Sequence, residues 1–213
     1  MPPATLRIIR EEHSALAAML RSIVLLLDQH RRGRTQPDFR ALRAMLFYVD
    51  EFPEQRHHRK ESELLFPKLR ARTPLAREQL DRLDAEHARG EHMIRELEHS
   101  LLGFEMLGDS RRAAFEQAAR RYVDFYLAHM ALEEREILPL AERVLTREDW
   151  IELDEAFEAS RDPLTGHAPE PDYQALFTQI IGVVPAPIGL GSVGALPVNP
   201  SPFFWRHKET TSR

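Results

Sequence analysis

Two eleven-residue stretches that begin 72 positions apart carry the same pattern of histidine, glutamate and proline. The first, HHRKESELLFP, begins at His57, and the second, HMALEEREILP, begins at His129. In both, the glutamate follows the first histidine by four residues and the proline follows the glutamate by six. A repeat on this scale constrains the fold, because it predicts two similar halves that each contain a pair of helices.

Apolar residues recur at helical spacing over most of residues 5–158, and no alternating strand-like stretch competes with them. The pattern predicts an all-α fold with four long amphipathic helices and a short fifth one, at about residues 5–32, 39–71, 74–102, 111–144 and 147–156. The short connections between the long helices favour an antiparallel up-down-up-down four-helix bundle.

Local features set the expected helix boundaries. Thr73 before Pro74 predicts an N-cap for the third helix, and Thr146 with Asp149 predicts the cap of the fifth. The stretch GFEMLGDS is expected to connect the third and fourth helices. Pro53 lacks a backbone N–H, so we expect a kink or a π-type irregularity inside the second helix.

The composition changes after Ser160, where most of the prolines lie. We therefore divide the chain into a bundle domain, residues 1–160, and a Pro/Gly-rich C-terminal extension, residues 161–213, with one short helix near 173–181. Apolar side chains in this otherwise irregular tail predict that it packs on the bundle or on a partner subunit. In the second case the protein forms a homodimer through its tail.

Charge and composition argue against several classes of protein. The net charge of −5, with acidic and basic residues interspersed, argues against a nucleic-acid binder. The absence of cysteine excludes disulfides, thiolate metal sites and cysteine nucleophiles. The first residues contain no signal-peptide core, so a cytoplasmic location is expected. Residues 178–198 are uncharged and long enough to cross a bilayer, but their prolines and glycines argue against a membrane-spanning helix.

The repeat places candidate metal ligands on the inner face of each long helix. Residues four apart share a helix face, so each His-x-x-x-Glu pair presents a nitrogen and a carboxylate together. His13 and His87 lie on the apolar stripes of the first and third helices, and Glu91 follows His87 by four residues. The predicted metal ligands are His13, His57, Glu61, His87, Glu91, His129 and Glu133.

Several carboxylates buried together are costly unless cations neutralise them. Four imidazoles with two or three carboxylates suit two first-row transition metals that share the carboxylates. Two iron ions are the preferred interpretation, with manganese or zinc as substitutes. The position in the first helix that corresponds to Glu91 is Ala17, so the ligand set is uneven and could leave one metal open to a small molecule.

Neighbouring residues allow other interpretations. His57 and Glu61 taken alone could form an ordinary ion pair on a solvated helix, but the repeat argues against this. His58 lies about 100° round the helix from His57, which predicts a place beside the ligands or at the surface. Tyr122 and Tyr126 are expected to belong to the core. A ferritin-like site needs Glu-x-x-His on two helices, and only the stretch EQRH before His58 fits, so it remains a minor alternative.

These residues resemble the hemerythrin-like, or HHE cation-binding, family, in its bacterial branch. The family pattern H…HxxxE…H…HxxxE is matched in order by His13, His57, Glu61, His87, His129 and Glu133. The resemblance covers about residues 5–158. It implies a four-helix bundle with a non-haem di-iron centre, bridged by the two glutamates and by an oxygen species. Members of the family carry or sense dioxygen, sense iron, or act on nitric oxide or peroxide.

One position departs from the oxygen carriers of that family. Their third helix supplies a second histidine one turn after the first, and Glu91 stands at that position here. A carboxylate there would stabilise the ferric state, which favours redox or peroxide chemistry, or sensing, over simple oxygen carriage. Three functions remain open: a protein that binds or senses O2 or NO, a redox enzyme that removes peroxide or NO, and an iron-homeostasis protein whose metal occupancy is the signal.

Overall fold

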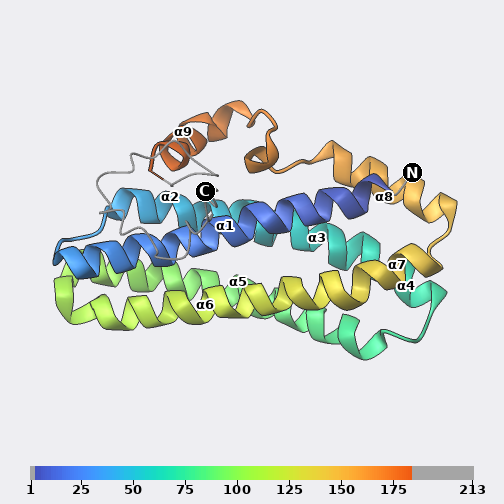
Figure 1. Cartoon of the computed structure of the whole chain (residues 1–213), viewed down its shortest axis with the longest axis horizontal. Helices are drawn as coiled ribbons and strands as arrows, with labels where there is room; N and C mark the ends of the chain where they lie inside the picture. Colours follow the sequence, from blue (N-terminus) through green and yellow to red (C-terminus); the bar gives the residue numbers. More distant parts are fainter. Residues whose placement is uncertain (1–2, 184–213) are drawn as a thin grey trace, which may run out of the picture.

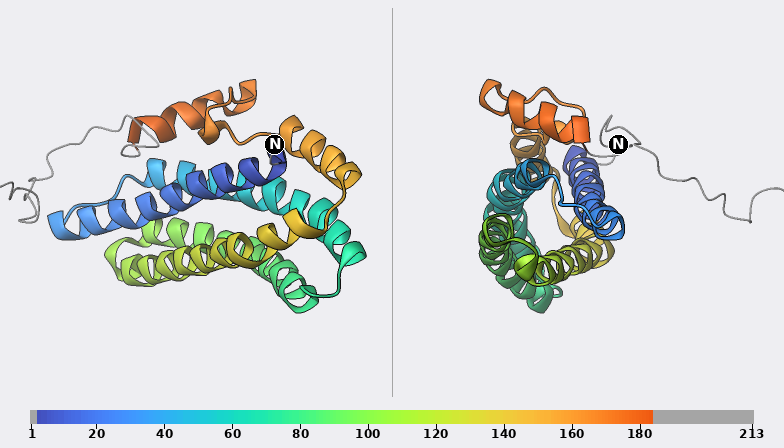
Figure 2. Two further views of the ribbon diagram at one scale, coloured as in Figure 1. Left: turned by 45° about the vertical axis from the view of Figure 1, so that its right-hand side comes forward. Right: turned by 90° about the vertical axis from the view of Figure 1, so that its left-hand side faces the viewer.

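Four long helical arms run alternately up and down around a common core in the computed structural model, which describes residues 3–183 (Figure 1). The arms are formed by α1 (Ala4–Gly33), then α2 (Phe39–Val49), α3 (His58–Lys60) and α4 (Phe66–Arg72), then α5 (Arg77–Leu107), then α6 (Arg112–Leu132) and α7 (Leu138–Val144). Viewed along their axes, the arms surround one centre (Figure 2). The predicted all-α bundle is confirmed.

Three π-helical segments interrupt the second and fourth arms: η1 (Asp50–His57), η2 (Glu61–Leu65) and η4 (Glu133–Ile137). The N–H of Phe66 donates to the carbonyl of Glu61, and the N–H of Leu138 donates to the carbonyl of Glu133, so both bonds span five residues. The proline that closes each repeat follows its π segment and cannot donate a backbone bond of its own. The duplicated sequence pattern therefore has a duplicated backbone irregularity.

The predicted irregularity at Pro53 is also confirmed. Pro53 lies inside η1, and its carbonyl accepts the N–H of His58 across five residues. A π turn is wider than an α turn, and such turns are frequent at functional sites. In this protein, each of the three π segments contains a predicted metal ligand of the second or fourth arm.

The core consists of two apolar clusters with a polar layer between them. One cluster gathers buried side chains from residues 16–27, 42–52, 94–104 and 115–130 of the four arms. The other gathers them from residues 6–9, 65–69, 80–83 and 132–141, together with α8 (Arg147–Ala159). On the first three arms the buried histidines and glutamates fall between these stretches, and on the fourth arm His129 and Glu133 lie where the two stretches meet. The polar layer thus crosses the bundle with apolar packing on both sides.

Two of the predicted boundaries differ from the structure. The third long helix begins at Arg77, and Thr73 instead accepts a hydrogen bond from the N–H of Leu75, so its predicted N-cap role is wrong. Residues 103–107 are helical instead of forming a connection, because burial of Phe104 in the core extends α5 past Gly103. The short fifth helix is confirmed as α8.

The capping box of α8 also ties this helix to α4. Asp149 accepts hydrogen bonds from the N–H and hydroxyl of Thr146, and from the guanidinium of Arg72 at 2.7 and 3.1 Å. The bond from Arg72 is the largest cause that lowers the pKa of the Asp149 carboxyl below its ordinary value. A lowered pKa in the folded state adds stability above the ordinary pKa of about 3.9, and that stability is lost as the pH falls.

We therefore expect Asp149→Asn to lower the free energy of unfolding at pH 7 by about 1 kcal/mol, since a cap is lost and Arg72 is partly exposed and screened. The difference from wild type should narrow as the pH falls below about 4. Urea unfolding followed by circular dichroism at a series of pH values measures both effects. Glu148→Gln, an exposed neighbour, is the control. A difference that does not change with pH would contradict this assignment.

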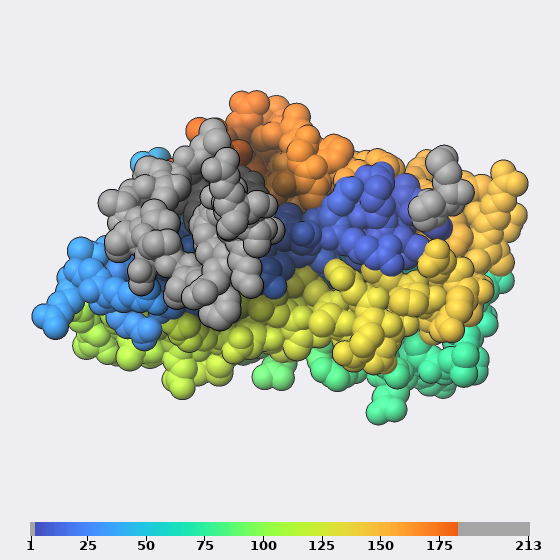
Figure 3. Space-filling view, in the orientation of Figure 1, coloured from blue at the N-terminus to red at the C-terminus, as the bar shows by residue number. Residues whose placement is uncertain are grey.

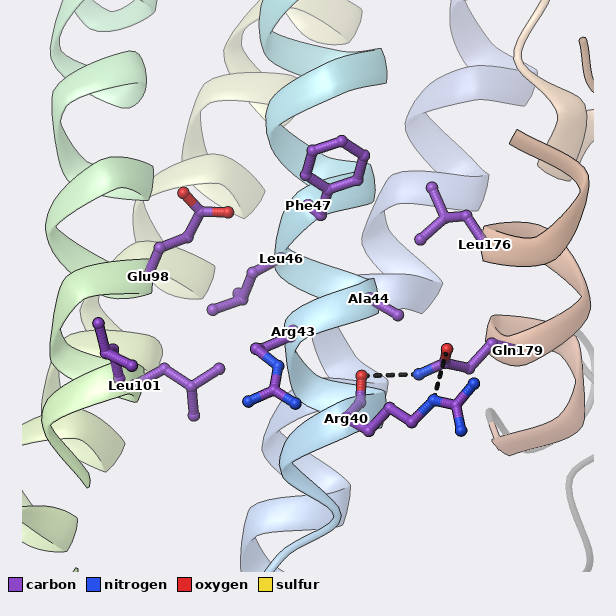
Figure 4. Close-up of a pocket in the computed structure, with 10 residues that line it drawn as sticks. Arg40, Arg43, Ala44, Leu46, Phe47, Glu98, Leu101, Leu176 and Gln179 are labelled. Atoms are coloured by element: carbon purple, nitrogen blue, oxygen red, sulfur yellow. Dashed lines mark hydrogen bonds between the residues drawn. The ribbon is translucent and has the colours of Figure 1, made fainter. Parts of the chain in front are cut away.

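The described part of the tail adds one more helix, α9 (Gln174–Val183), which packs on α2. The Nε of Arg40 donates to the side chain of Gln179 at 3.2 Å, and the Gln179 amide donates to the Arg40 carbonyl at 2.7 Å (Figure 4). A cavity of about 500 Å3 lies between α2, α5 and α9, and no histidine lines it. The predicted short helix near 173–181 is found here.

The described residues cover only part of the predicted C-terminal extension. The predicted packing and dimer contacts of residues 184–213 lie outside the described residues. The predicted domain boundary at residue 160 stays a prediction. Among the described helices, none has both the length and the apolar character that crossing a membrane requires.

Candidate metal centre

Buried imidazoles and carboxylates converge within the polar layer. Their possible ligand atoms form two groups in which all atoms lie within 4.8 Å of one another, and Glu61 belongs to both groups. The groups are His58, Glu61, His87 and His129, and His13, His57 and Glu61. All of these side chains are buried.

The two glutamates of the repeat face both groups. Glu61 places one carboxylate oxygen 3.1 Å from the Nε2 of His57 and the other 3.5 Å from the Nε2 of His87. Glu133 places one oxygen 3.2 Å from the Nε2 of His13 and 3.6 Å from that of His129. Each carboxylate therefore lies where it could be shared between two cations.

Buried polar atoms without partners show that these residues fit such cations. Among the described residues, nine buried side-chain atoms lack a hydrogen-bond partner, and seven of them lie in this cluster. The seven atoms are both carboxylate oxygens of Glu61 and of Glu133, and the Nε2 atoms of His13, His57 and His58. A buried polar group without a partner costs about 1–3 kcal/mol. Seven such donor atoms in one place indicate that the cluster is built to hold a cation. Nitrogen and carboxylate donors in this mixture suit a first-row transition metal.

The outer nitrogens of the histidines are held by acceptors outside the cluster. The Nδ1 of His57 lies 2.6 Å from Glu12, and the Nδ1 of His129 lies 3.0 Å from Glu86. Metal-binding imidazoles are commonly oriented in this way, because a carboxylate on one nitrogen directs the lone pair of the other toward the metal. Sequence reasoning missed both glutamates, although each stands directly before a predicted ligand, in the two Glu-His pairs at 12–13 and 86–87.

The electrostatics of the cluster follow from this crowding. Burial lowers the pKa of the His57 imidazole, but Glu61 and Glu12 outweigh it and raise that pKa to about 10. Burial also opposes the charged form of His13, yet Glu133 and Glu134 raise its pKa to about 8. The cluster without metal therefore holds protons that balance its carboxylates. A bound cation would take the place of these protons.

The structure brings together six of the seven predicted ligands, namely His13, His57, Glu61, His87, His129 and Glu133. It does not bring Glu91 to them, because the Glu91 side chain is 45% exposed and pairs with Arg95 at 3.4 Å. The buried stripe of α5 runs from His87 through Gly90 to Ile94. Glu91 lies one position beyond that stripe, which is why four-residue spacing alone misplaced it.

His58 was expected beside the ligands or at the surface, and the structure buries it inside the cluster. The expectation assumed α-helical geometry, in which His57 and His58 diverge by about 100°. The π-helical backbone of η1 ends at this pair and changes the directions of the two side chains. The ring of His58 stacks on that of His87, with centroids 4.3 Å apart.

A second buried network adjoins His58. The Nδ1 of His58 lies 3.1 Å from one oxygen of Glu54, and the other oxygen accepts the hydroxyls of Tyr122 and Tyr126. Burial is the main cause that raises the pKa of Glu54 to about 7, and the two tyrosine bonds partly offset it. The expectation that both tyrosines are core residues agrees with their burial. Their hydroxyls also reach the edge of the cluster.

A groove of about 360 Å3 leads from the surface to His13. It runs between α1 and α6, which lie side by side on the face drawn in Figure 3. Ala17 and Met130 line it beside His13, with Arg10 and Arg21 among the other lining residues. The groove therefore brings a small molecule to the edge of the cluster, at the buried side chain of His13.

Comparison with protein families agrees with the cluster. The model of the hemerythrin HHE cation-binding domain matches residues 4–141, which include every histidine and glutamate of the cluster. Comparisons with curated proteins and with solved structures gave no significant match. Because the family model spans well over half of the sequence, this chain belongs to the hemerythrin HHE cation-binding domain family.

Proposed function

We propose that this protein binds two metal ions, iron in its native state, and uses them to bind or react with a small diatomic or peroxide ligand. The proposed ligands include His13, His57, Glu61, His87, His129 and Glu133. The observation that carries the proposal is the set of seven buried donor atoms in one cluster that lack hydrogen-bond partners among the described residues. Manganese or zinc could substitute, because both accept imidazole and carboxylate ligands.

The chain's own residues would hold the metal pair and limit access to it. Glu61 and Glu133 would be shared between the two metals, since each faces both groups of donors. Glu12 and Glu86 would fix the orientation of the imidazoles on the outer side. The apolar clusters on both sides of the layer would exclude bulk water. The bound metals would supply electrons and an open coordination position to a small ligand.

Reversible binding of a small ligand is the function that the arrangement favours. The sequence favoured redox chemistry or sensing over simple oxygen carriage because of a carboxylate ligand from Glu91, and that side chain instead pairs with Arg95 near the surface. Stopped-flow mixing of the reduced, iron-loaded protein with oxygen or nitric oxide tests the proposal. We expect a spectral change that reverses when the ligand is removed. Irreversible oxidation alone would overturn reversible binding.

A redox enzyme that removes peroxide or nitric oxide is the second candidate. It is favoured by Tyr126, an oxidisable side chain whose ring stacks on His58 at 5.3 Å. Repeated turnover of peroxide by the iron-loaded protein, lost in His87→Ala, would support it. An iron-homeostasis role instead requires that occupancy control stability. A melting temperature that is equal with and without iron would exclude that role.

The groove beside His13 provides a test of ligand access. Ala17→Trp should fill the groove and slow the reaction of the reduced protein with oxygen by roughly tenfold, equivalent to about 1.4 kcal/mol of barrier. Metal content should not change, because Ala17 offers no ligand atom. Ala113→Trp, on the exposed face of α6, is the matched control. Equal oxygen rates in wild type and Ala17→Trp would show that ligands enter elsewhere.

A further inference from the structure

His58 shares an arrangement with the four histidines of the proposed ligand set. In all five, Nδ1 is held by an oxygen acceptor outside the cluster. The pairs are His13 with Glu134 at 3.0 Å, His57 with Glu12 at 2.6 Å, His58 with Glu54 at 3.1 Å, His87 with Ser62 at 2.8 Å and His129 with Glu86 at 3.0 Å. In Ser62 the hydroxyl proton is donated to Asp84, so its oxygen is free to accept from the imidazole. His58 therefore matches the pattern by which metal-binding imidazoles are oriented.

The inner nitrogen of His58, Nε2, is buried and forms no hydrogen bond with the described residues. Glu54 occupies Nδ1 at 3.1 Å, so Nε2 is the nitrogen of His58 that remains for a further partner. The ligand atoms of His58, Glu61, His87 and His129 lie within 4.8 Å of one another. This is the spacing that one metal ion could bridge.

The surroundings of Glu54 hold it in place for this purpose. Its second oxygen accepts the hydroxyls of Tyr122, at 2.7 Å, and of Tyr126. Room for the tyrosine hydroxyl exists because residue 90 of α5 is glycine, since a Cβ there would lie 2.7 Å from the Tyr126 ring and 3.0 Å from Glu54. Two buried tyrosines and a glycine thus hold in place the carboxylate that contacts the outer nitrogen of His58.

We propose that His58 is a further metal ligand, which binds through Nε2 at the position shared with His87 and His129, and that Glu54 is its positioning residue. This inference rests on the proposed metal pair. It assigns to the second arm two adjacent histidine ligands, which an α-helical backbone would direct apart and which the π segment η1 brings to one cluster. It also gives a role to Glu54, a buried carboxylate that touches no other predicted ligand in the described hydrogen bonds.

Cobalt(II) provides the test, because the Nδ1–H resonance of an imidazole that binds paramagnetic cobalt through Nε2 moves far outside the normal proton range. The cobalt-loaded, full-length wild type should show five such exchangeable resonances, and His58→Gln should show four. His92→Gln removes a histidine that is 74% exposed, and it should keep all five. Four resonances in the wild type, with none lost in His58→Gln, would show that His58 is a core histidine only.

Glu54→Gln gives a second measurement that does not depend on the folding of His58→Gln. Loss of an outer carboxylate commonly lowers metal affinity by about 10–100-fold, so chelator competition should show a weaker cobalt site in this variant. An unchanged affinity would overturn the positioning role. The cobalt content of the wild type separates this inference from the proposed function. Two ions with four resonances would reject only His58 as a ligand, whereas no cobalt uptake would reject both.

Discussion

Replacement of Glu61 with alanine is expected to abolish binding of the metal pair, with a loss of affinity greater than about 100-fold at each position. The reason is that Glu61 belongs to both groups of donors, so its removal takes a ligand from each metal at once. Loss of an outer-sphere partner alone commonly costs about 10–100-fold, and loss of a shared ligand should cost more. Metal content measured by elemental analysis after dialysis against excess metal gives the result directly.

The fold should survive this change. Glu61 is fully buried, and its shortest contact in the metal-free bundle is with the His57 imidazole at 3.1 Å, which can release its proton when the carboxylate is removed. Glu61→Gln keeps the volume and provides a variant without a cavity. Glu63→Ala, two positions along the same π segment, removes a carboxylate that is 59% exposed and pairs with Arg59. That control should retain full metal content. Full metal content in Glu61→Ala would contradict the proposed sharing of Glu61.

Replacement of Gly90 with alanine is expected to lower the free energy of unfolding by about 2 kcal/mol, although alanine is the better helix former by about 1 kcal/mol. The new Cβ would overlap the hydroxyl of Tyr126 and lie 2.7 Å from its ring carbon. The tyrosine cannot yield easily, since its ring stacks on His58 and its hydroxyl is bonded to Glu54. Thermal unfolding should show a melting temperature lower by roughly 4–8 °C for a chain of this size.

Two companion variants identify the cause. Gly103→Ala lies in the same helix, and a Cβ there would meet nothing within 4 Å, so stability should rise slightly. Tyr126→Phe removes the clashing oxygen, and it should therefore make Gly90→Ala less harmful in the double variant than in the single one. If Gly90→Ala proves as stable as Gly103→Ala, that result would contradict the close contact between Gly90 of α5 and Tyr126 of α6.

The fold followed from the sequence because its signals are local and repeated. The apolar stripes of the four arms and the short connections between them are sufficient to predict an antiparallel bundle. Pro53 also marked where the second helix becomes irregular, whereas the π segments before Pro67 and Pro139 were not predicted. The boundary errors at Thr73 and Phe104 have a different cause: tertiary packing decided how far α5 extends, and local propensity did not.

Six of the seven predicted ligands followed from the repeat and from helical spacing, although three of them, His57, Glu61 and Glu133, lie in π segments. His13 and His87 lie on regular helices, so their inward direction followed from spacing. His58 directly follows the π segment η1, so a projection that assumes α-helical turns throughout misplaces its side chain. Glu91 was misplaced for a subtler reason, because the buried stripe passes through Gly90, a residue that hydrophobic patterns do not count.

The outer partners could not be assigned from spacing, because they come from neighbouring arms. Glu12 of the first arm reaches His57 of the second, and Glu86 of the third reaches His129 of the fourth. The two contacts are equivalent, because in each half of the chain the first arm supplies the glutamate and the second arm supplies the histidine. A Glu-His dipeptide on the first helix of each half was the available signal, and only the packing of the arms reveals which histidine each glutamate contacts.

The most direct test of the central claim is the metal content of anaerobically purified protein, measured together with its optical spectrum. The proposed centre predicts two iron ions per chain, with a charge-transfer band of an oxygen-bridged ferric pair after exposure to air, and loss of both ions in Glu61→Ala. Well-folded protein that binds no metal, or only one ion per chain, even when iron, manganese or zinc is supplied in excess would contradict it.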